Sequence, residues 1–136
     1  MLDAPPVVAV INTSPDVLEI LRLTLHHAGI VVMTAMTFDL REGRIDIESF
    51  MRQHRPRVVV YDVAPPYDLN WELFLHTRSL PAMEGVQFIL TSTNPQHVHE
   101  LPGAHDEDVY EIVGKPFDLD RIVQAVREAL HIRPVR

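Results

Sequence analysis

Lys115 and Asp62 are the charged side chains whose positions in the sequence suggest chemistry. Lys115 follows an apolar run and precedes Pro116, Phe117 and a helix that Asp118 can cap, whereas Asp62 ends another apolar run. In a parallel sheet flanked by helices, residues at the carboxyl ends of the strands face the ligand crevice. A lysine in that place can neutralise an anion, so the two side chains indicate either an anion-binding site or an internal ion pair.

Apolar runs that could form strands alternate with segments of helical periodicity. The runs are 7–11, 30–34, 57–62, 86–92 and 109–113. Their nearly continuous apolar character is typical of parallel strands that helices cover on both faces. Helices are expected over 15–28, 47–54, 69–80, 95–101 and 118–130, with Ser14, Asp46, Asn94 and Asp118 as N-caps. The sequence therefore predicts an α/β fold of (βα)₅ order.

A chain of this order with right-handed crossovers favours a doubly wound, five-stranded parallel sheet with the flavodoxin-like strand order 2-1-3-4-5. That order makes the first and third strands neighbours and opens the crevice between their carboxyl ends. The side chains expected there are Asn12, Thr13, Asp62, Thr91 or Ser92, and Lys115. Residues 1–136 are expected to form a single domain, with 1–6 and 131–136 as frayed tails.

Composition narrows the classes of function. The chain has 136 residues, a formal net charge of −7 and no run of basic residues, which disfavours nucleic-acid binding. No segment has the length and apolar character of a membrane span or a signal peptide, so we expect a cytoplasmic protein that contacts no membrane. The absence of cysteine excludes disulfides, zinc–thiolate sites and thiol nucleophiles.

The sequence resembles the receiver domain of bacterial two-component response regulators over nearly its whole length. The resemblance is carried by residues 55–62, 88–92 and 114–119, and KPFDLDRIVQAVREAL at 115–130 is similar to the end of many receivers. It implies that Asp62 is the phosphoacceptor, that Mg²⁺ and Lys115 neutralise the phosphoryl oxygens, and that Thr91 donates a hydrogen bond to the phosphoryl group. It also implies a cis Lys115–Pro116 bond and an output face formed by the fourth helix, the last strand and the fifth helix.

The expected metal site departs from the family pattern. Receivers carry two acidic residues at the end of the first strand, where this chain has Asn12 and Thr13. Mg²⁺ requires charged oxygen ligands, so any Mg²⁺ binding at Asp62 and the Ala64 carbonyl would be weak, and no other metal or cofactor is expected. Lys115 is then expected to act as the counter-ion of Asp62.

Three further departures concern the surroundings of the site. Ile112 occupies the position of the family's switch aromatic, and Tyr110, expected on the same face of the strand, is the candidate replacement. Asn70 replaces a glycine and is expected to keep left-handed backbone geometry. Residues 35–45 are expected to form a long loop that serves as a contact surface.

We therefore expect an atypical, stand-alone receiver domain that is not an enzyme and that works in phosphorelay signalling. Its partners would be other signalling proteins, such as a histidine kinase or an output protein, with homodimerisation through the last two helices. One alternative is a working phosphoacceptor in which Asp62 is phosphorylated and Asp68 or water replaces the lost ligands. Another is a flavodoxin-like binder of a small phosphate ligand at Asn12, Thr13 and Ser14.

Overall fold

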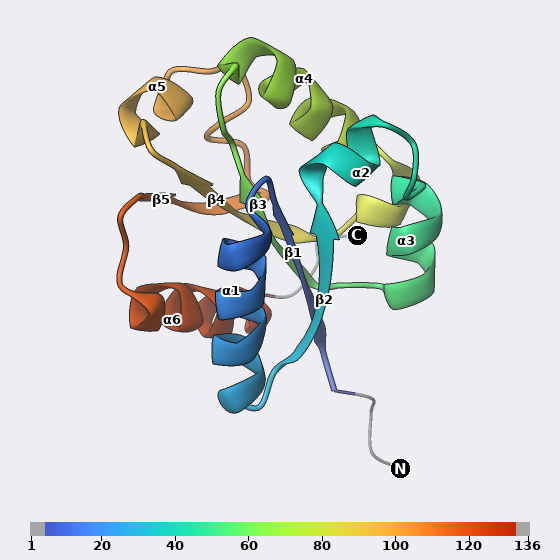
Figure 1. Cartoon of the computed structure of the whole chain (residues 1–136), viewed down its shortest axis with the longest axis vertical. Coiled ribbons are helices and arrows are strands. Elements are labelled where there is room, and N and C mark those ends of the chain that lie inside the picture. Colours follow the sequence, from blue (N-terminus) through green and yellow to red (C-terminus); the bar gives the residue numbers. More distant parts are fainter. Residues whose placement is uncertain (1–4, 133–136) are drawn as a thin grey trace.

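The computed structural model describes residues 5–132, so most of the expected tails lie outside the described residues. The strands are β1 (Val7–Asn12), β2 (Val31–Met36), β3 (Val58–Asp62), β4 (Gln87–Ser92) and β5 (Val109–Gly114). The helices are α1 (Pro15–His27), α2 (Thr37–Arg41), α3 (Ile47–His54), α4 (Tyr67–Arg78), α5 (Pro95–His99) and α6 (Leu119–Leu130), with a 3₁₀ turn at Pro81–Met83. Figure 1 labels these strands and helices and colours them along the sequence from blue to red.

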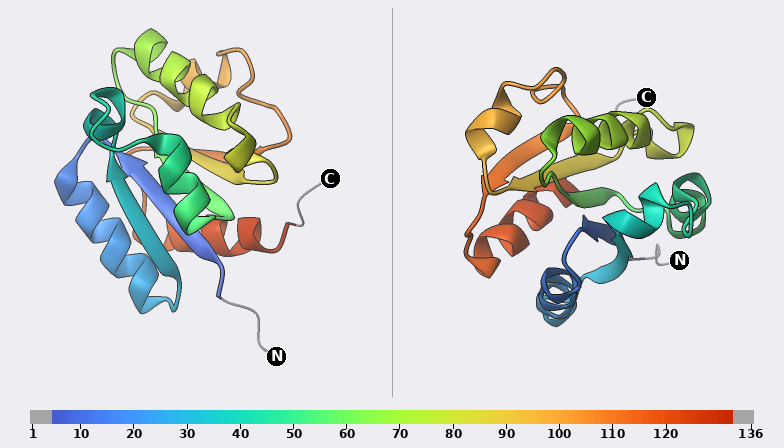
Figure 2. Two further views of the ribbon diagram at one scale, coloured as in Figure 1. Left: turned by 90° about the vertical axis from the view of Figure 1, so that its right-hand side faces the viewer. Right: turned by 45° about the horizontal axis from the view of Figure 1, so that its top comes forward.

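The five strands form one parallel sheet in the order β2-β1-β3-β4-β5, which confirms the predicted fold and strand order. Helices α1 and α6 cover one face of the sheet, and α2, α3, α4 and α5 lie on the other (Figures 1 and 2). Because every strand runs in the same direction, all five carboxyl ends meet at one edge. No helix within residues 5–132 is long and apolar enough to cross a membrane.

The helix starts follow from capping residues that the sequence predicts. Each cap accepts a hydrogen bond through its side-chain oxygen from a backbone N–H two or three residues further on. The caps are Ser14, Asp46, Asn94 and Asp118. Helix α3 ends at Arg55, which adopts a left-handed conformation with φ of 47° just before Pro56.

Two predicted segments were wrong in their extent. Residues 35–45 are not one long loop, because β2 continues through Met36, pairs there with Asn12 at the end of β1, and leads directly into α2. Leu40 of α2 is buried in the core, which explains why this segment folds back onto the sheet. The fourth predicted helix, over 95–101, is reduced to the five residues of α5, and the chain from 100 to 108 has no regular helix or strand.

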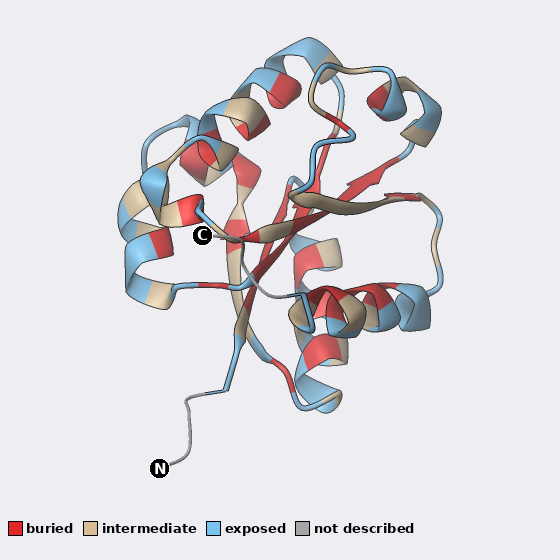
Figure 3. Cartoon of the chain, turned by 180° about the vertical axis from the view of Figure 1, so that it is seen from behind, coloured by how far each residue is buried: buried red, intermediate tan, exposed pale blue. Residues whose placement is uncertain are grey.

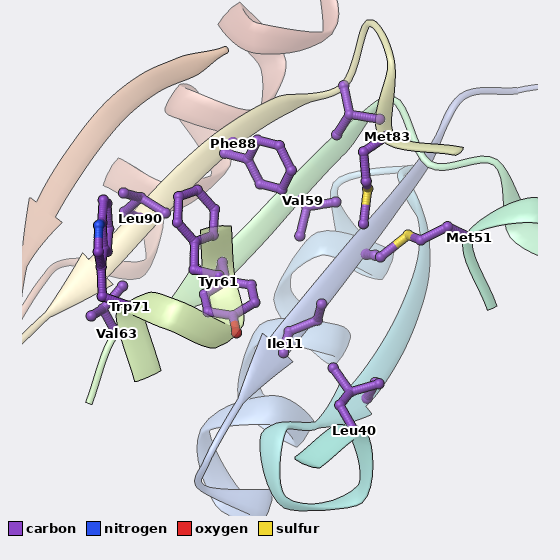
Figure 4. Close-up of a cluster of buried hydrophobic side chains, with 14 of the residues drawn as sticks. Ile11, Leu40, Met51, Val59, Tyr61, Val63, Trp71, Met83, Phe88 and Leu90 are labelled. Carbon is purple, nitrogen blue, oxygen red and sulfur yellow. The ribbon is translucent and has the colours of Figure 1, made fainter. Parts of the chain in front are cut away.

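Two apolar clusters, one on each face of the sheet, form the core. Strand β3 is buried along its whole length, as its unbroken apolar sequence predicts (Figure 3). On the face of α3, α4 and α5, Tyr61, Phe74 and Phe88 pack with neighbouring ring centroids 5.1 Å apart. The Tyr61 hydroxyl points toward the side of this cluster that holds Ile11 (Figure 4) and has no hydrogen-bond partner among the described residues.

Replacing Tyr61 by phenylalanine should stabilise the protein by about 1 kcal/mol, because it removes a buried hydroxyl that has no partner among the described residues. Burial also raises the pKa of Tyr61. The folded protein therefore keeps this hydroxyl protonated at a pH at which the unfolded chain has already ionised it. Through this hydroxyl, the free energy of unfolding of the wild type should fall by about 1.4 kcal/mol per pH unit above pH about 10. The fall should be less steep in Tyr61→Phe.

Urea unfolding at neutral and alkaline pH would measure both effects. Tyr67→Phe is the matched control, because the Tyr67 hydroxyl lies 3.2 Å from Thr93 Oγ1 and its loss should not stabilise. A lower stability of Tyr61→Phe would contradict the prediction.

Candidate functional site

The polar site lies where β3, β4 and β5 end, and the register of the sheet assembles it. Asp62 pairs directly with Thr91 on the neighbouring strand. The ladder continues past the strands, because the Val63 N–H donates to the Thr91 carbonyl and the Lys115 N–H donates to the Ser92 carbonyl, each at 2.8 Å. These bonds fix the backbone on both sides of the site, so the side chains of Asp62, Thr91 and Lys115 are held on a rigid frame.

Asp62, Thr91 and Lys115 meet as the sequence predicts. The Lys115 Nζ lies 2.5 Å from Asp62 Oδ1, and the Thr91 hydroxyl donates to the same oxygen at 2.7 Å. The Asp62 side chain is only 2% exposed and that of Lys115 is 22% exposed. The carboxylate is therefore buried, and a charge-assisted ion pair and a hydrogen bond compensate for its lost hydration. The Lys115–Pro116 bond is cis, as the resemblance implies.

The end of β1 contributes a turn to the site instead of carboxylates. The buried Asn12 side chain accepts a hydrogen bond from the Ser14 N–H at 2.9 Å, and Thr13 is exposed. Ser14 itself caps α1. Of the two candidate hydroxyls on β4, only Thr91 reaches Asp62, because the Ser92 hydroxyl accepts from the Asn94 N–H at 3.1 Å.

Asn70 and Arg41 are site residues whose roles the sequence did not indicate. The expectation of left-handed geometry at Asn70 was wrong, because this residue lies within the first turns of α4. Its buried side chain donates through Nδ2 to the Ala64 carbonyl at 2.5 Å and accepts a hydrogen bond from the Arg41 guanidinium of α2. The asparagine in place of an expected glycine was the only sequence signal, and Arg41 had none.

The expected pairing of Tyr110 and Ile112 on one face of β5 was also wrong. The register between β4 and β5 shifts by one residue, so Phe88 pairs with Val109 and Ile89 pairs with Glu111. This irregularity is a bulge that breaks the alternation of side chains. Ile112 packs with the cluster beside α5, whereas Tyr110 packs on the other face. The Tyr110 hydroxyl donates to Glu128 of α6 at 2.9 Å, and this bond raises the Tyr110 pKa.

Several solved structures with a similar arrangement of strands and helices are response regulators. A chemotaxis response regulator, CheY4 of Vibrio cholerae, has 20% identity with a TM-score of 0.71, covering 93% of this chain and 99% of that chain. A response regulator from Thermotoga maritima has 18% identity with a TM-score of 0.72, covering 95% and 100%. A receiver protein from Pseudomonas putida has 22% identity with a TM-score of 0.70, covering 93% and 99%. The chain has the receiver-domain fold. No protein-family model and no curated protein sequence matches it.

The donor set of this receiver fold does not suit the Mg²⁺ ion that the resemblance implies. The Asp62 carboxylate already holds Lys115 and Thr91 on one oxygen. The Ala64 carbonyl accepts the Asn70 amide, and the Asn12 oxygen accepts the Ser14 N–H. Within residues 5–132 no group of three or more acidic, histidine or cysteine side chains could hold a metal ion. Since Mg²⁺ favours carboxylate oxygens and keeps several waters, these engaged, mostly neutral donors fit it poorly.

Proposed function

We propose that the chain is a signalling module of two-component, phosphorelay-type transduction that acts through protein–protein contacts and does not require Mg²⁺-dependent phosphorylation. The main support is the Asp62 carboxylate, which is buried and paired directly with Lys115. Asn12 and Thr13 add no negative charge beside it. The proposal treats the chain as a cytoplasmic protein that is not an enzyme, with a histidine kinase or an output protein as partner.

The contact surface that we assign to this module consists of α5, β5 and α6. The irregular segment 100–108 between α5 and β5 is anchored on α4, because the Trp71 indole donates to the Pro102 carbonyl at 3.0 Å and Arg78 donates to the Gly103 carbonyl at 2.8 Å. A surface held in this way is ready to bind a partner without a preceding rearrangement. Homodimerisation through α5 and α6 belongs to the same proposal.

Incubation with acetyl phosphate and Mg²⁺ should leave the intact mass of the wild-type protein unchanged, because Lys115 and Thr91 both engage Asp62 Oδ1 and the surrounding donors fit Mg²⁺ poorly. Asp62→Asn is the matched control, since it keeps the shape of the side chain and removes the acceptor. A phosphate adduct on the wild type that disappears in Asp62→Asn would overturn the proposal.

A working phosphoacceptor is the second candidate, and one observation favours it. Asp62, Thr91 and Lys115, the three residues to which the resemblance assigns acceptor and phosphoryl-binding roles, do converge at one point. In that case a phosphoryl group on Asp62 would take over the contacts with Thr91 and Lys115. Nothing comparable favours a small phosphate ligand at Asn12, Thr13 and Ser14, because the Asn12 and Ser14 side chains are already bonded within the turn.

A further inference from the structure

A chain of polar contacts joins α2 to the segment that follows Asp62. The Arg41 guanidinium binds the Asn70 side-chain oxygen, and the Asn70 amide donates to the Ala64 carbonyl at 2.5 Å. Asn70 is only 2% exposed, and both polar atoms of its side chain have protein partners, as is usual for buried polar groups. We call Arg41, Asn70 and the Ala64 carbonyl the clamp. It fastens the backbone two residues beyond the buried carboxylate.

The clamp brings a second organic cation to this end of β3. Arg41 binds the Asn70 side chain, whose amide reaches the Ala64 carbonyl two residues after Asp62. The buried carboxylate is thus paired directly with Lys115, and the clamp ties a second cationic side chain, Arg41, to the segment that follows it. A divalent cation entering here would meet repulsion from both and would have to displace the Asn70 amide to reach the carbonyl.

We propose that Arg41 and Asn70 together take the place of the divalent cation of a receiver site and exclude that cation from this pocket. The Asn70 amide is hydrogen-bonded to the Ala64 carbonyl oxygen, and the Arg41 guanidinium supplies the positive charge that a metal ion would otherwise supply. This inference rests on the proposed function, in which the pocket works without Mg²⁺, and it assigns the exclusion to particular residues. Loss of the acidic pair and gain of the clamp are then two separate barriers to metal binding.

The test separates these two barriers in a background where metal binding is measurable. Asn12→Asp/Thr13→Asp restores the acidic pair that the resemblance leads one to expect. In that background, Arg41→Ala should raise Mn²⁺ affinity roughly tenfold, the scale on which residues supporting metal ligands act. Titration calorimetry would give the affinity, and Mn²⁺-induced broadening of the Val63 and Ala64 amide signals would locate the ion. Asn70→Ala should give a similar gain, with the dispersion of the amide spectrum checking its fold.

Arg44→Ala is the matched control. Arg44 follows α2, carries the same charge, is 65% exposed and pairs with Asp39 at 3.4 Å. Its loss should change Mn²⁺ affinity less than about twofold, because exposed charges interact weakly through water. Equal affinities with and without Arg41, or no detectable Mn²⁺ binding in any variant of the restored background, would overturn the inference.

Failure of the inference can be told apart from failure of the proposed function. Tight Mn²⁺ binding and phosphorylation of the unmodified chain on Asp62 would refute both. An unmodified chain that stays metal-free, combined with no gain from Arg41→Ala or Asn70→Ala, would refute the clamp alone.

Discussion

Lys115→Ala should lower the free energy of unfolding by about 2–4 kcal/mol, because it leaves the buried Asp62 carboxylate without its counter-ion. The carboxylate is held away from solvent, since its side chain is 2% exposed and bonded to the Thr91 hydroxyl. The Thr91 hydroxyl alone compensates for only part of its lost hydration. Urea unfolding at neutral pH would measure the loss.

Asp62→Asn should lower the free energy of unfolding by less than about 1.5 kcal/mol, because Lys115 is less buried than Asp62. The Lys115 side chain is 22% exposed and can return its ammonium group to water once the carboxylate has gone. The double variant should resemble Asp62→Asn, so a double-mutant cycle should give a large coupling energy. Arg22→Ala removes an exposed pair with Glu19 and serves as the reference, with an expected loss under about 0.5 kcal/mol. Lys115→Ala at wild-type stability would show that the pair does not stabilise the fold.

The parts of the site that follow strand ends were predictable from the sequence. Parallel strands bring their carboxyl ends to one edge, so an apolar run followed by a polar residue gives both the strand and the position of the side chain. Asp62 is the last residue of such a run, Thr91 is the last but one of another, and Lys115 follows a third after Gly114; all three side chains meet. The N-caps were predictable for a similar reason, because capping uses residues close together in the chain.

The clamp and the faces of β5 were not predictable, because each depends on how distant segments fit together. Arg41 reaches Asn70 only after β2 has been extended and α2 has folded back onto the sheet. Tyr110 turns away from Ile112 because the pairing with β4 slips by one residue, and no glycine or proline marks that bulge. Propensity and periodicity describe local structure, and these contacts join residues that local patterns do not relate.

Arg78→Ala should lower stability by about 2–4 kcal/mol and loosen the proposed contact surface, because this one guanidinium ties segment 100–108 to α4. Arg78 donates to the Gly103 carbonyl and to both oxygens of Asp108, and its guanidinium carbon lies 5.2 Å from the centre of the Phe74 ring. The side chain is 10% exposed, so these contacts are shielded from water. Arg78→Lys should recover only part of the loss, since an ammonium group cannot make the bidentate contact.

Amide hydrogen exchange would show where Arg78→Ala acts. Exchange should accelerate at Ala104, Asp106 and Val109, whose N–H groups bond within the segment, and stay slow in β1. A uniform acceleration across the sheet would contradict a local anchoring role.

Two glycines with nearly the same φ provide an independent test of the anchor. Gly103 has φ of +84° and Gly29 has φ of +83°, so alanine at either position incurs a similar backbone strain of about 1 kcal/mol. A Cβ on Gly103 would also lie 2.9 Å from Arg78 Nη1, whereas a Cβ on Gly29 would meet nothing within 4 Å. Gly103→Ala should therefore be the more destabilising by about 1–2 kcal/mol, with the same local exchange pattern as Arg78→Ala. In the Arg78→Ala background that excess should vanish, because the side chain that the new methyl group displaces is already absent.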